Sequence, residues 1–96
     1  MIKFGVCLPT FQGASSRPHT IDFDGLESFA LRAEELGYDS LWAADHLMLG
    51  REGGMHEAWS VISALALTTS SIRLGTLVLC NTHRSPALTA KMVATL

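Results

Sequence analysis

The chain has 96 residues, of which 48% are hydrophobic and 17% charged, and its formal net charge is −2. This composition is typical of a globular protein with a packed core and excludes an intrinsically disordered chain. A slightly acidic chain without a basic cluster lacks the positive surface that nucleic acid requires, and no block of like charges favours a membrane surface. We therefore expect neither nucleic acid nor a membrane as a partner.

The N-terminus does not have the pattern of a secretory signal. Its short apolar stretch is interrupted by Lys3 and reaches Pro9 too soon. A later apolar region is broken by Arg73 and a run of Ser and Thr, so it does not supply the roughly 20 apolar residues of a membrane span. Cys7 and Cys80 lie far apart in apolar contexts and form neither a disulfide framework nor a CxxC pair. We expect a cytoplasmic protein.

The first predicted elements are a strand and a helix. The sequence KFGVCLP at 3–9 is apolar at nearly every position and predicts a buried strand, with Cys7 in the core. Asp24, followed three residues later by Glu27, predicts a capping box at the start of a helix. Gly37 lies where that helix would end, because glycine adopts a left-handed conformation without penalty. The apolar face of this helix consists of Leu26, Phe29, Ala30, Ala33 and Leu36.

Strands and helices continue to alternate along the chain. The later predicted elements are a strand at 40–44, a helix at 57–69, a strand at 72–80 and a helix from Pro86 with Ser85 as its N-cap. Strands that recur about every 35 residues with helices between them indicate a parallel sheet with helical crossovers. Apolar strands in such a sheet are expected to be covered on both faces.

Three strands leave two open edges and little core. We therefore predict that residues 1–96 are the N-terminal part of a single larger domain, truncated in its third helix. A dinucleotide-binding fold would need G-x-G-x-x-G after the first strand, where PTFQGASS has one glycine. A (β/α)₈ barrel fits better, since eight such units need about 280 residues. The predicted fold class is α/β, the βαβαβα portion of a TIM barrel.

The segment LWAADHLMLG at 41–50 has two ionisable residues where a predicted strand ends. Asp45 and His46 therefore lie on the face where barrel enzymes carry their chemistry, together with the loops at 10–22, 47–55 and 81–85. Neighbouring residues of a strand point to opposite sides, so the two need not pair. His46 either transfers a proton or caps the strand, and one interpretation of Asp45 is no more than a strand-end cap. No spacing predicts a metal site.

Other conspicuous residues have simpler interpretations. Cys80 is a small apolar residue or, less expected, a nucleophile, because no base is adjacent. His83 and Arg84 form a solvated loop pair or bind phosphate. Trp42 and Trp59 are expected to pack between the strands and the helices.

Two stretches carry a family resemblance: AEELGYDSLWAADH at 33–46 and RLGTLVLCNTHRSPALTAKMVATL at 73–96. Together they resemble the luciferase-like monooxygenase superfamily of flavin and deazaflavin enzymes. The resemblance implies a (β/α)₈ barrel that binds reduced FMN or the deazaflavin F420 at the carboxyl ends of its strands. Some members activate oxygen for monooxygenation, and others transfer a hydride to or from a substrate carbon.

The resemblance also implies roles for individual residues. His46 would be the catalytic residue, as proton donor or as a group that positions the substrate. A non-proline cis peptide would lie at Leu77–Val78, against the cofactor ring. The cofactor-binding residues that the resemblance implies are Asp45, Leu77, Val78, Cys80 and Asn81.

The function predicted for the whole protein is an oxidoreductase that uses F420, or alternatively FMN, on a small organic substrate. An FMN-dependent monooxygenase acting with molecular oxygen is one alternative. A truncated, non-catalytic fragment that folds only by association with another chain is a second, and a homodimer is left open. The loop after His46 offers Met48, Leu49 and Gly50 where some F420 dehydrogenases have an aromatic residue, which counts against a sugar-phosphate substrate.

Overall fold

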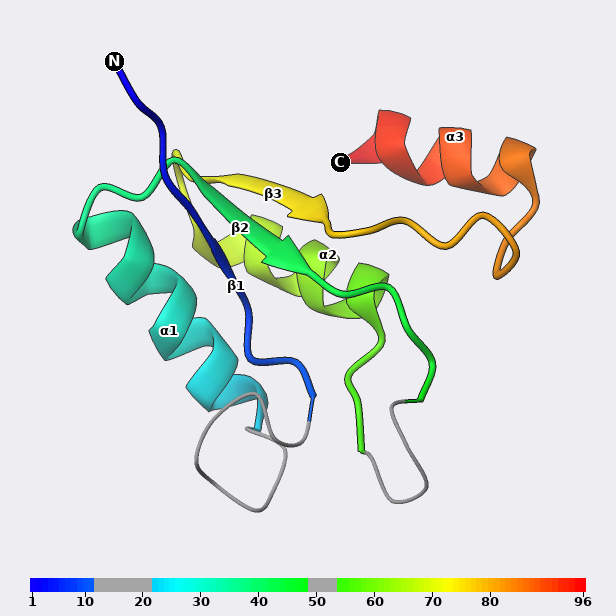
Figure 1. The fold of residues 1–96 in the computed structure, drawn as a ribbon, viewed down its shortest axis with the longest axis horizontal. Helices are drawn as coiled ribbons and strands as arrows, with labels where there is room; N and C mark the ends of the chain where they lie inside the picture. The colour runs from blue at the N-terminus through cyan, green and yellow to red at the C-terminus, as the bar shows by residue number, and fades with distance from the viewer. Residues whose placement is uncertain (12–21, 49–53) are drawn as a thin grey trace.

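A computed structural model describes residues 1–11, 22–48 and 54–96 (Figure 1). Three parallel strands form one sheet in the order β1-β2-β3. The elements are β1 (Gly5–Cys7), α1 (Phe23–Glu35), β2 (Ser40–Ala43), α2 (Ala58–Thr68), β3 (Arg73–Thr76) and α3 (Pro86–Thr95). The predicted α/β class with a parallel sheet is confirmed. Much of the predicted loops, including Leu49 and Gly50, lies outside the described residues.

Helix α1 begins two residues earlier than predicted. Asp22 is its N-cap, and the Asp22 side chain accepts a hydrogen bond of 2.9 Å from the Gly25 amide. The predicted cap at Asp24 is therefore wrong, because that residue already lies in the first helical turn. Gly37 follows the last helical residues with φ of 81°, which confirms its predicted role at the helix end.

The other two helices begin with side-chain caps. Glu57 caps α2 by accepting hydrogen bonds from the Trp59 and Ser60 amides at 3.1 and 2.8 Å. Ser85 caps α3 by accepting from the Leu88 amide, and α3 starts with a proline, as predicted. Both caps satisfy amides that have no partner inside the helix.

The third strand is shorter than the sequence suggests. It ends at Thr76 rather than at Cys80, and the Leu77 amide makes the last bond to its neighbour, 2.8 Å to the Ala43 carbonyl. Strand β2 ends at Ala43, so β3 has no strand to pair with beyond that point. The peptide bond Leu77–Val78 is cis, which confirms the position that the family resemblance implied. We refer to residues 77–85 as the β3–α3 segment.

Helices α1 and α2 pack on one face of the sheet, as Figure 1 shows. Strand β2 accordingly alternates between half-buried and buried residues, and the buried ones join the core with both helices. The core consists of Leu8, Leu26, Ala30, Ala33, Leu41, Ala43, Ala58, Val61, Ile62, Leu65 and Ile72. Helix α3 buries no residue in this arrangement.

Trp42 lies across the other face of the sheet. A Cβ atom on Gly5 would come within 2.5 Å of its indole nitrogen, and one on Gly75 within 2.7 Å of its six-membered ring. The indole N–H donates to the Ser40 hydroxyl at 2.9 Å. Trp42 therefore does not pack between strand and helices, and Cys7 is exposed rather than in the core. Both predictions are wrong because no helix in the described ranges covers this face.

Helix α1 is also tied to the turn between α2 and β3. The Glu34 carboxylate accepts hydrogen bonds from three consecutive amides, those of Ser70 at 2.9 Å, Ser71 at 2.6 Å and Ile72 at 2.8 Å. These bonds stabilise the ionised form, with that from Ser71 the strongest, and lower the pKa of Glu34 to about 2 from 4.5. The contact fixes the end of α1 against the start of β3.

Glu34 should make stability depend on acid. Because its folded pKa is lowered, its contribution is complete above pH 4.5 and is lost as the pH falls toward 2. We expect Glu34→Gln to lower the urea midpoint at pH 7 and to flatten its decline between pH 5 and pH 2, relative to the unmodified chain. Glu35→Gln is the control, because Glu35 forms only an exposed pair with Arg32. Equal acid sensitivity in the two variants would contradict this role of Glu34.

Candidate functional site

Exposed apolar side chains gather after two adjacent strands. Since β2 and β3 are parallel, their carboxyl ends meet at the same edge of the sheet. Residues past those ends carry exposed fractions such as 74% for Met48 and 67% for Val78. We call this set the apolar rim: Leu47, Met48, Leu77, Val78 and Leu79. Large apolar side chains that are exposed together are typical of a surface that binds a ligand or another part of a protein.

Asp45 lies beneath this edge and is only 2% exposed. Its Oδ2 atom accepts hydrogen bonds from the Cys80 amide at 2.9 Å and from Nη1 of Arg84 at 2.8 Å. Its Oδ1 atom accepts from Nη2 of Arg84 at 2.8 Å. The two side chains therefore pair through two parallel bonds, the strong and directional arrangement of guanidinium with carboxylate.

Arg84 also reaches the start of α2. Its Nη2 atom donates to the Glu57 carboxylate at 2.8 Å, and its guanidinium lies 5.8 Å from the centre of the Trp59 ring. We call this set the Asp45–Arg84–Glu57 bridge. It joins the residues after β2, the N-cap of α2 and the residue before the N-cap of α3.

The bridge remains ionised around neutral pH. The hydrogen bond from Arg84 lowers the pKa of Asp45, helped by the Cys80 amide and opposed by burial. Burial raises the pKa of Glu57, but hydrogen bonds from Ser60, the Trp59 amide and Arg84 outweigh it, so the net shift is downward. Asp45 in turn raises the pKa of Arg84. Each charge therefore stabilises its partner.

Arg84 differs from its sequence-based prediction. Its side chain is only 10% exposed and is bonded to two carboxylates, so it is neither a solvated loop residue nor a free phosphate ligand. His83 is half-buried, with Nδ1 3.9 Å from Oδ1 of Asp45. The sequence predicted a helix at 57–69 but did not indicate that Glu57 caps this helix and binds Arg84.

The predicted site residues fall into two groups. The structure brings Cys80 onto Asp45 through its main-chain amide, and Leu77 onto the end of β2. His46 and Asn81 are exposed, and within the described residues no hydrogen bond joins either to the bridge.

The thiol of Cys80 has its own polar neighbour. Its Sγ atom lies 3.2 Å from the Thr82 hydroxyl, which lowers the pKa of the thiol. Cys80 is only half-buried, and its thiol lies next to a hydroxyl. Its surroundings are therefore more polar than those of the buried apolar residue that the sequence predicted.

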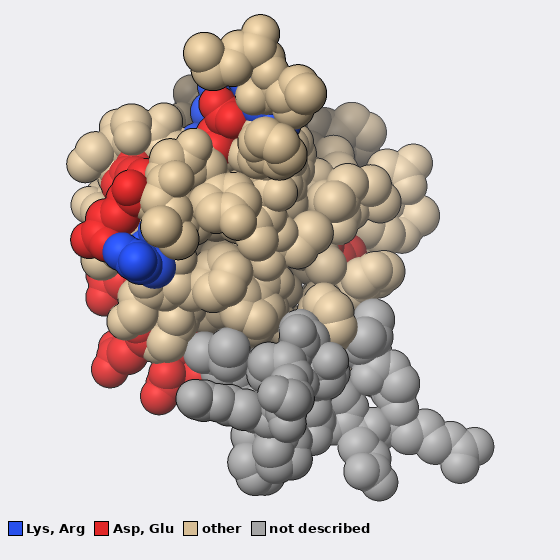
Figure 2. Space-filling view, turned by 60° about the vertical axis from the view of Figure 1, so that its left-hand side comes forward, with Lys and Arg blue, Asp and Glu red and all other residues tan. Residues whose placement is uncertain are grey.

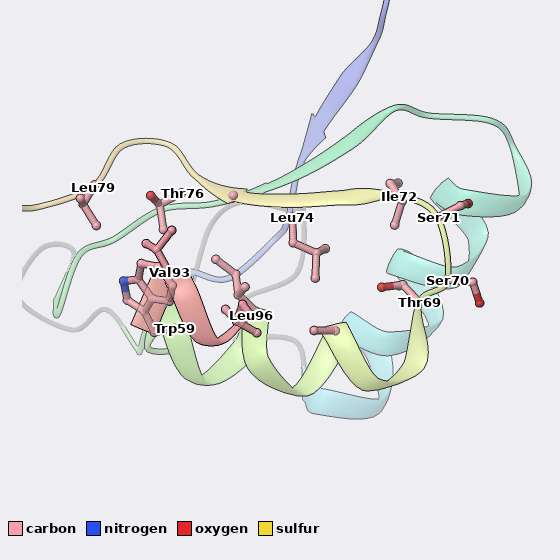
Figure 3. Close-up of a pocket in the computed structure, with 13 residues that line it drawn as sticks. Trp59, Thr69, Ser70, Ser71, Ile72, Leu74, Thr76, Leu79, Val93 and Leu96 are labelled. Carbon is pink, nitrogen blue, oxygen red and sulfur yellow. The ribbon is translucent and has the colours of Figure 1, made fainter. Parts of the chain in front are cut away.

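A separate cavity of about 520 Å³ lies between α2, β3 and α3 (Figure 3). Trp59, Leu74, Val93 and Leu96 point into it from these three elements, and Leu79 reaches its end. None of the predicted catalytic or cofactor-binding residues lines it. The cavity therefore continues the apolar core on the helix side and shares only Leu79 with the apolar rim.

The distribution of charged side chains on the face shown in Figure 2 does not favour binding of a polyanion. On the face shown in Figure 2, acidic side chains lie along one side, few basic ones stand between them, and most of the face is uncharged. In the part of the chain that the structure describes, no helix is long and apolar enough to cross a membrane, and no group of three His, Cys, Asp or Glu side chains could hold a metal ion.

The buried pair should be sensitive to the loss of one charge. Asp45→Asn leaves the buried Arg84 guanidinium without its main counter-ion, and removing one member of such a pair costs about 3 kcal/mol. We expect this loss in the free energy of urea unfolding at pH 7. Arg32→Met, which removes an exposed pair, is the control and should cost less than about 1 kcal/mol. Equal losses in both variants would contradict the bridge.

Known proteins are similar to this chain in sequence and in fold. A family model described as luciferase-like monooxygenase matches residues 2–96. An F420-dependent glucose-6-phosphate dehydrogenase of Amycolatopsis mediterranei is 40% identical over 74 residues, which cover 74% of this chain and 22% of the relative. A 5,10-methylenetetrahydromethanopterin reductase of Archaeoglobus fulgidus is 37% identical over 71 residues, covering 74% of this chain and 20% of the relative.

A solved structure agrees with the fold. An F420-dependent secondary alcohol dehydrogenase, in complex with an F420–acetone adduct, superposes with a TM-score of 0.79 at 24% identity, covering 97% of this chain and 27% of that one. The present chain thus spans about a fifth of the length of the curated relatives that it matches. The match to the family model extends over nearly every residue, and the chain belongs to the luciferase-like monooxygenase family.

Proposed function

We propose that residues 1–96 are the N-terminal part of a single luciferase-like (β/α)₈ barrel, and that the whole protein is a cytoplasmic F420-dependent oxidoreductase. The glucose-6-phosphate dehydrogenase at 40% identity is named as F420-dependent and supports this cofactor. The methylenetetrahydromethanopterin reductase at 37% identity supports an oxidoreductase. A third, of Mycobacterium tuberculosis, is named as an F420-dependent hydroxymycolic acid dehydrogenase and is 36% identical over 76 residues. FMN is the alternative cofactor.

The observation that carries this proposal is the apolar rim at the strand ends. A flat, largely apolar ring is best held against exposed apolar side chains, with a few polar groups to fix its orientation. The rim and the exposed imidazole of His46 supply both kinds of group at the same edge of the sheet. The residues present therefore fit a deazaflavin or a flavin.

When bound, the cofactor would accept or supply a hydride. Leu77 and Val78 would contact its ring, and Cys80 and Asn81 would lie at the border of the same surface. His46 would donate or accept the proton that accompanies hydride transfer, because an imidazole side chain exchanges protons near neutral pH. The substrate would be a small organic molecule, in keeping with the alcohol and sugar phosphate named for relatives.

The second candidate is that this chain by itself is non-catalytic and folds only by association. Helix α3 buries no residue, and the Trp42 face of the sheet has no covering helix in the described ranges. Size-exclusion chromatography with circular dichroism on the 96-residue chain distinguishes the two. A cooperative monomer that binds F420 would contradict association as a requirement.

The cofactor and the role of His46 can be tested together in the whole protein. We expect F420 to bind at least tenfold more tightly than FMN in fluorescence titrations. His46→Ala should reduce turnover at least about 100-fold, the usual contribution of a positioned proton donor, with F420 affinity changed less than threefold. Turnover is followed with the substrates named for the relatives, and Lys91→Ala on α3 is the control.

Either of two results would overturn these assignments. Unchanged turnover in His46→Ala would remove the catalytic role of His46. Tighter binding of FMN than of F420, with oxygen consumption, would favour the monooxygenase alternative.

A further inference from the structure

The β3–α3 segment carries much of the apolar rim but is fastened at few points. In the ranges that the structure describes, Ser85 at the end of the segment caps α3, and the hydrogen bonds that tie the segment to β2, to the residue Asp45 after β2 and to α2 lie at two places. One is the Leu77 amide on the Ala43 carbonyl, and the other is the Asp45–Arg84–Glu57 bridge with the Cys80 amide. Val78 and Leu79 lie between these two fastenings with exposed side chains.

Both sets of hydrogen bonds attach the segment to the end of β2 or to the residues directly after it. Ala43 is the last residue of that strand, and Asp45 follows two residues later, directly before His46. Oδ2 of Asp45 is shared between the Cys80 amide and Arg84, so the guanidinium fixes the orientation of the acceptor that holds Cys80. The position of the rim relative to His46 therefore depends on the bridge.

Stability alone does not require an ion pair at this place. Replacing a buried pair by apolar side chains of similar size is often neutral or stabilising, because the desolvation of two charges offsets their attraction. An apolar replacement could not reproduce the directional bonds to the Cys80 amide and to Glu57. The geometry of the bridge, rather than its energy, is what an apolar pair would lose.

We propose that the Asp45–Arg84–Glu57 bridge positions the apolar rim for the cofactor ring, so that Asp45 and Arg84 are positioning residues that do not themselves touch the ring. Both oxygens of Asp45 already accept hydrogen bonds from Arg84, which favours this role over direct contact. The inference rests on the proposed function for the identity of the ring, but the holding of the segment is a property of this chain alone.

The first test measures the segment itself by amide hydrogen exchange. In the whole protein, the double variant Asp45→Leu with Arg84→Met should keep its melting temperature within a few degrees of that of the unmodified protein. Its Cys80 amide should exchange at least tenfold faster, with the Leu41 amide of β2 unchanged. Arg32→Met with Glu35→Leu, which removes an exposed pair of the same chemistry, is the control. An unchanged Cys80 exchange rate in the double variant would overturn the proposal.

A conservative variant covers the case in which the double variant does not fold. Arg84→Lys keeps the positive charge but cannot make the two parallel bonds to Asp45. We expect its Cys80 amide to exchange faster than in the unmodified protein but more slowly than in a second single variant, Arg84→Met, which keeps neither the charge nor the hydrogen bonds. A rate equal to that of the unmodified chain would overturn the proposal.

The second test measures F420 affinity in the whole protein by fluorescence titration. We expect the Kd for F420 to rise at least tenfold in the double variant. In Arg84→Lys it should lie between the values of the unmodified protein and the double variant. Faster Cys80 exchange with unchanged Kd would overturn the positioning of a ring site. If the unmodified protein binds neither F420 nor FMN, the proposed function fails, and the exchange rates still decide whether the bridge holds the segment.

Discussion

The buried pair between Asp45 and Arg84 is the interaction on which the strand-end edge depends. It connects two consecutive strand–helix units at the place where each strand stops, and Glu57 brings in the helix between them. A parallel sheet supplies hydrogen bonds only as far as its strands run together. Beyond that point side chains can hold the segments that follow, and here the Asp45 carboxylate and the Arg84 guanidinium bind each other, the Cys80 amide and Glu57.

The helices on the sheet and a contact at the opposite ends of the strands stabilise the sheet that carries this edge. Helices α1 and α2 cover one face of the sheet, and Glu34 fixes the opposite end of the structure by binding the turn before β3. The two acidic side chains thus do similar work at the two ends of the strands. Glu34 holds amides at the exposed end, whereas Asp45 holds an amide and a guanidinium in a buried one. Burial makes the second arrangement more dependent on having every partner in place.

Local signals in the sequence were sufficient for the alternation of strands and helices. Gly37 and Ser85 mark a helix end and a helix start through conformations and hydrogen bonds that span only a few residues. The position of the cis peptide came from the family resemblance and is confirmed. The end of β3 could not be predicted in this way, because it is set by where β2 stops rather than by its own apolar residues.

The contacts that the sequence did not reveal are long-range. Asp45 and Arg84 are 39 residues apart, and no periodicity or spacing marks two such residues as partners. Trp42 was assigned to the wrong face because its neighbours Gly5 and Gly75 become neighbours only through the register of three strands. Residue types at the strand ends therefore indicated where a candidate site lies, and tertiary pairing determined which of these residues bind one another.

The Cys80 amide resonance, followed by NMR from pH 7 to pH 2, tests most directly whether Asp45 holds the β3–α3 segment. An amide bonded to a carboxylate reports the protonation of that carboxylate. Because Arg84 and the amide lower the pKa of Asp45, we predict a resonance that stays constant through the ordinary aspartate range near pH 3.9 and shifts only at lower pH. A midpoint at the ordinary aspartate value would contradict the buried pair as the interaction that fixes this edge.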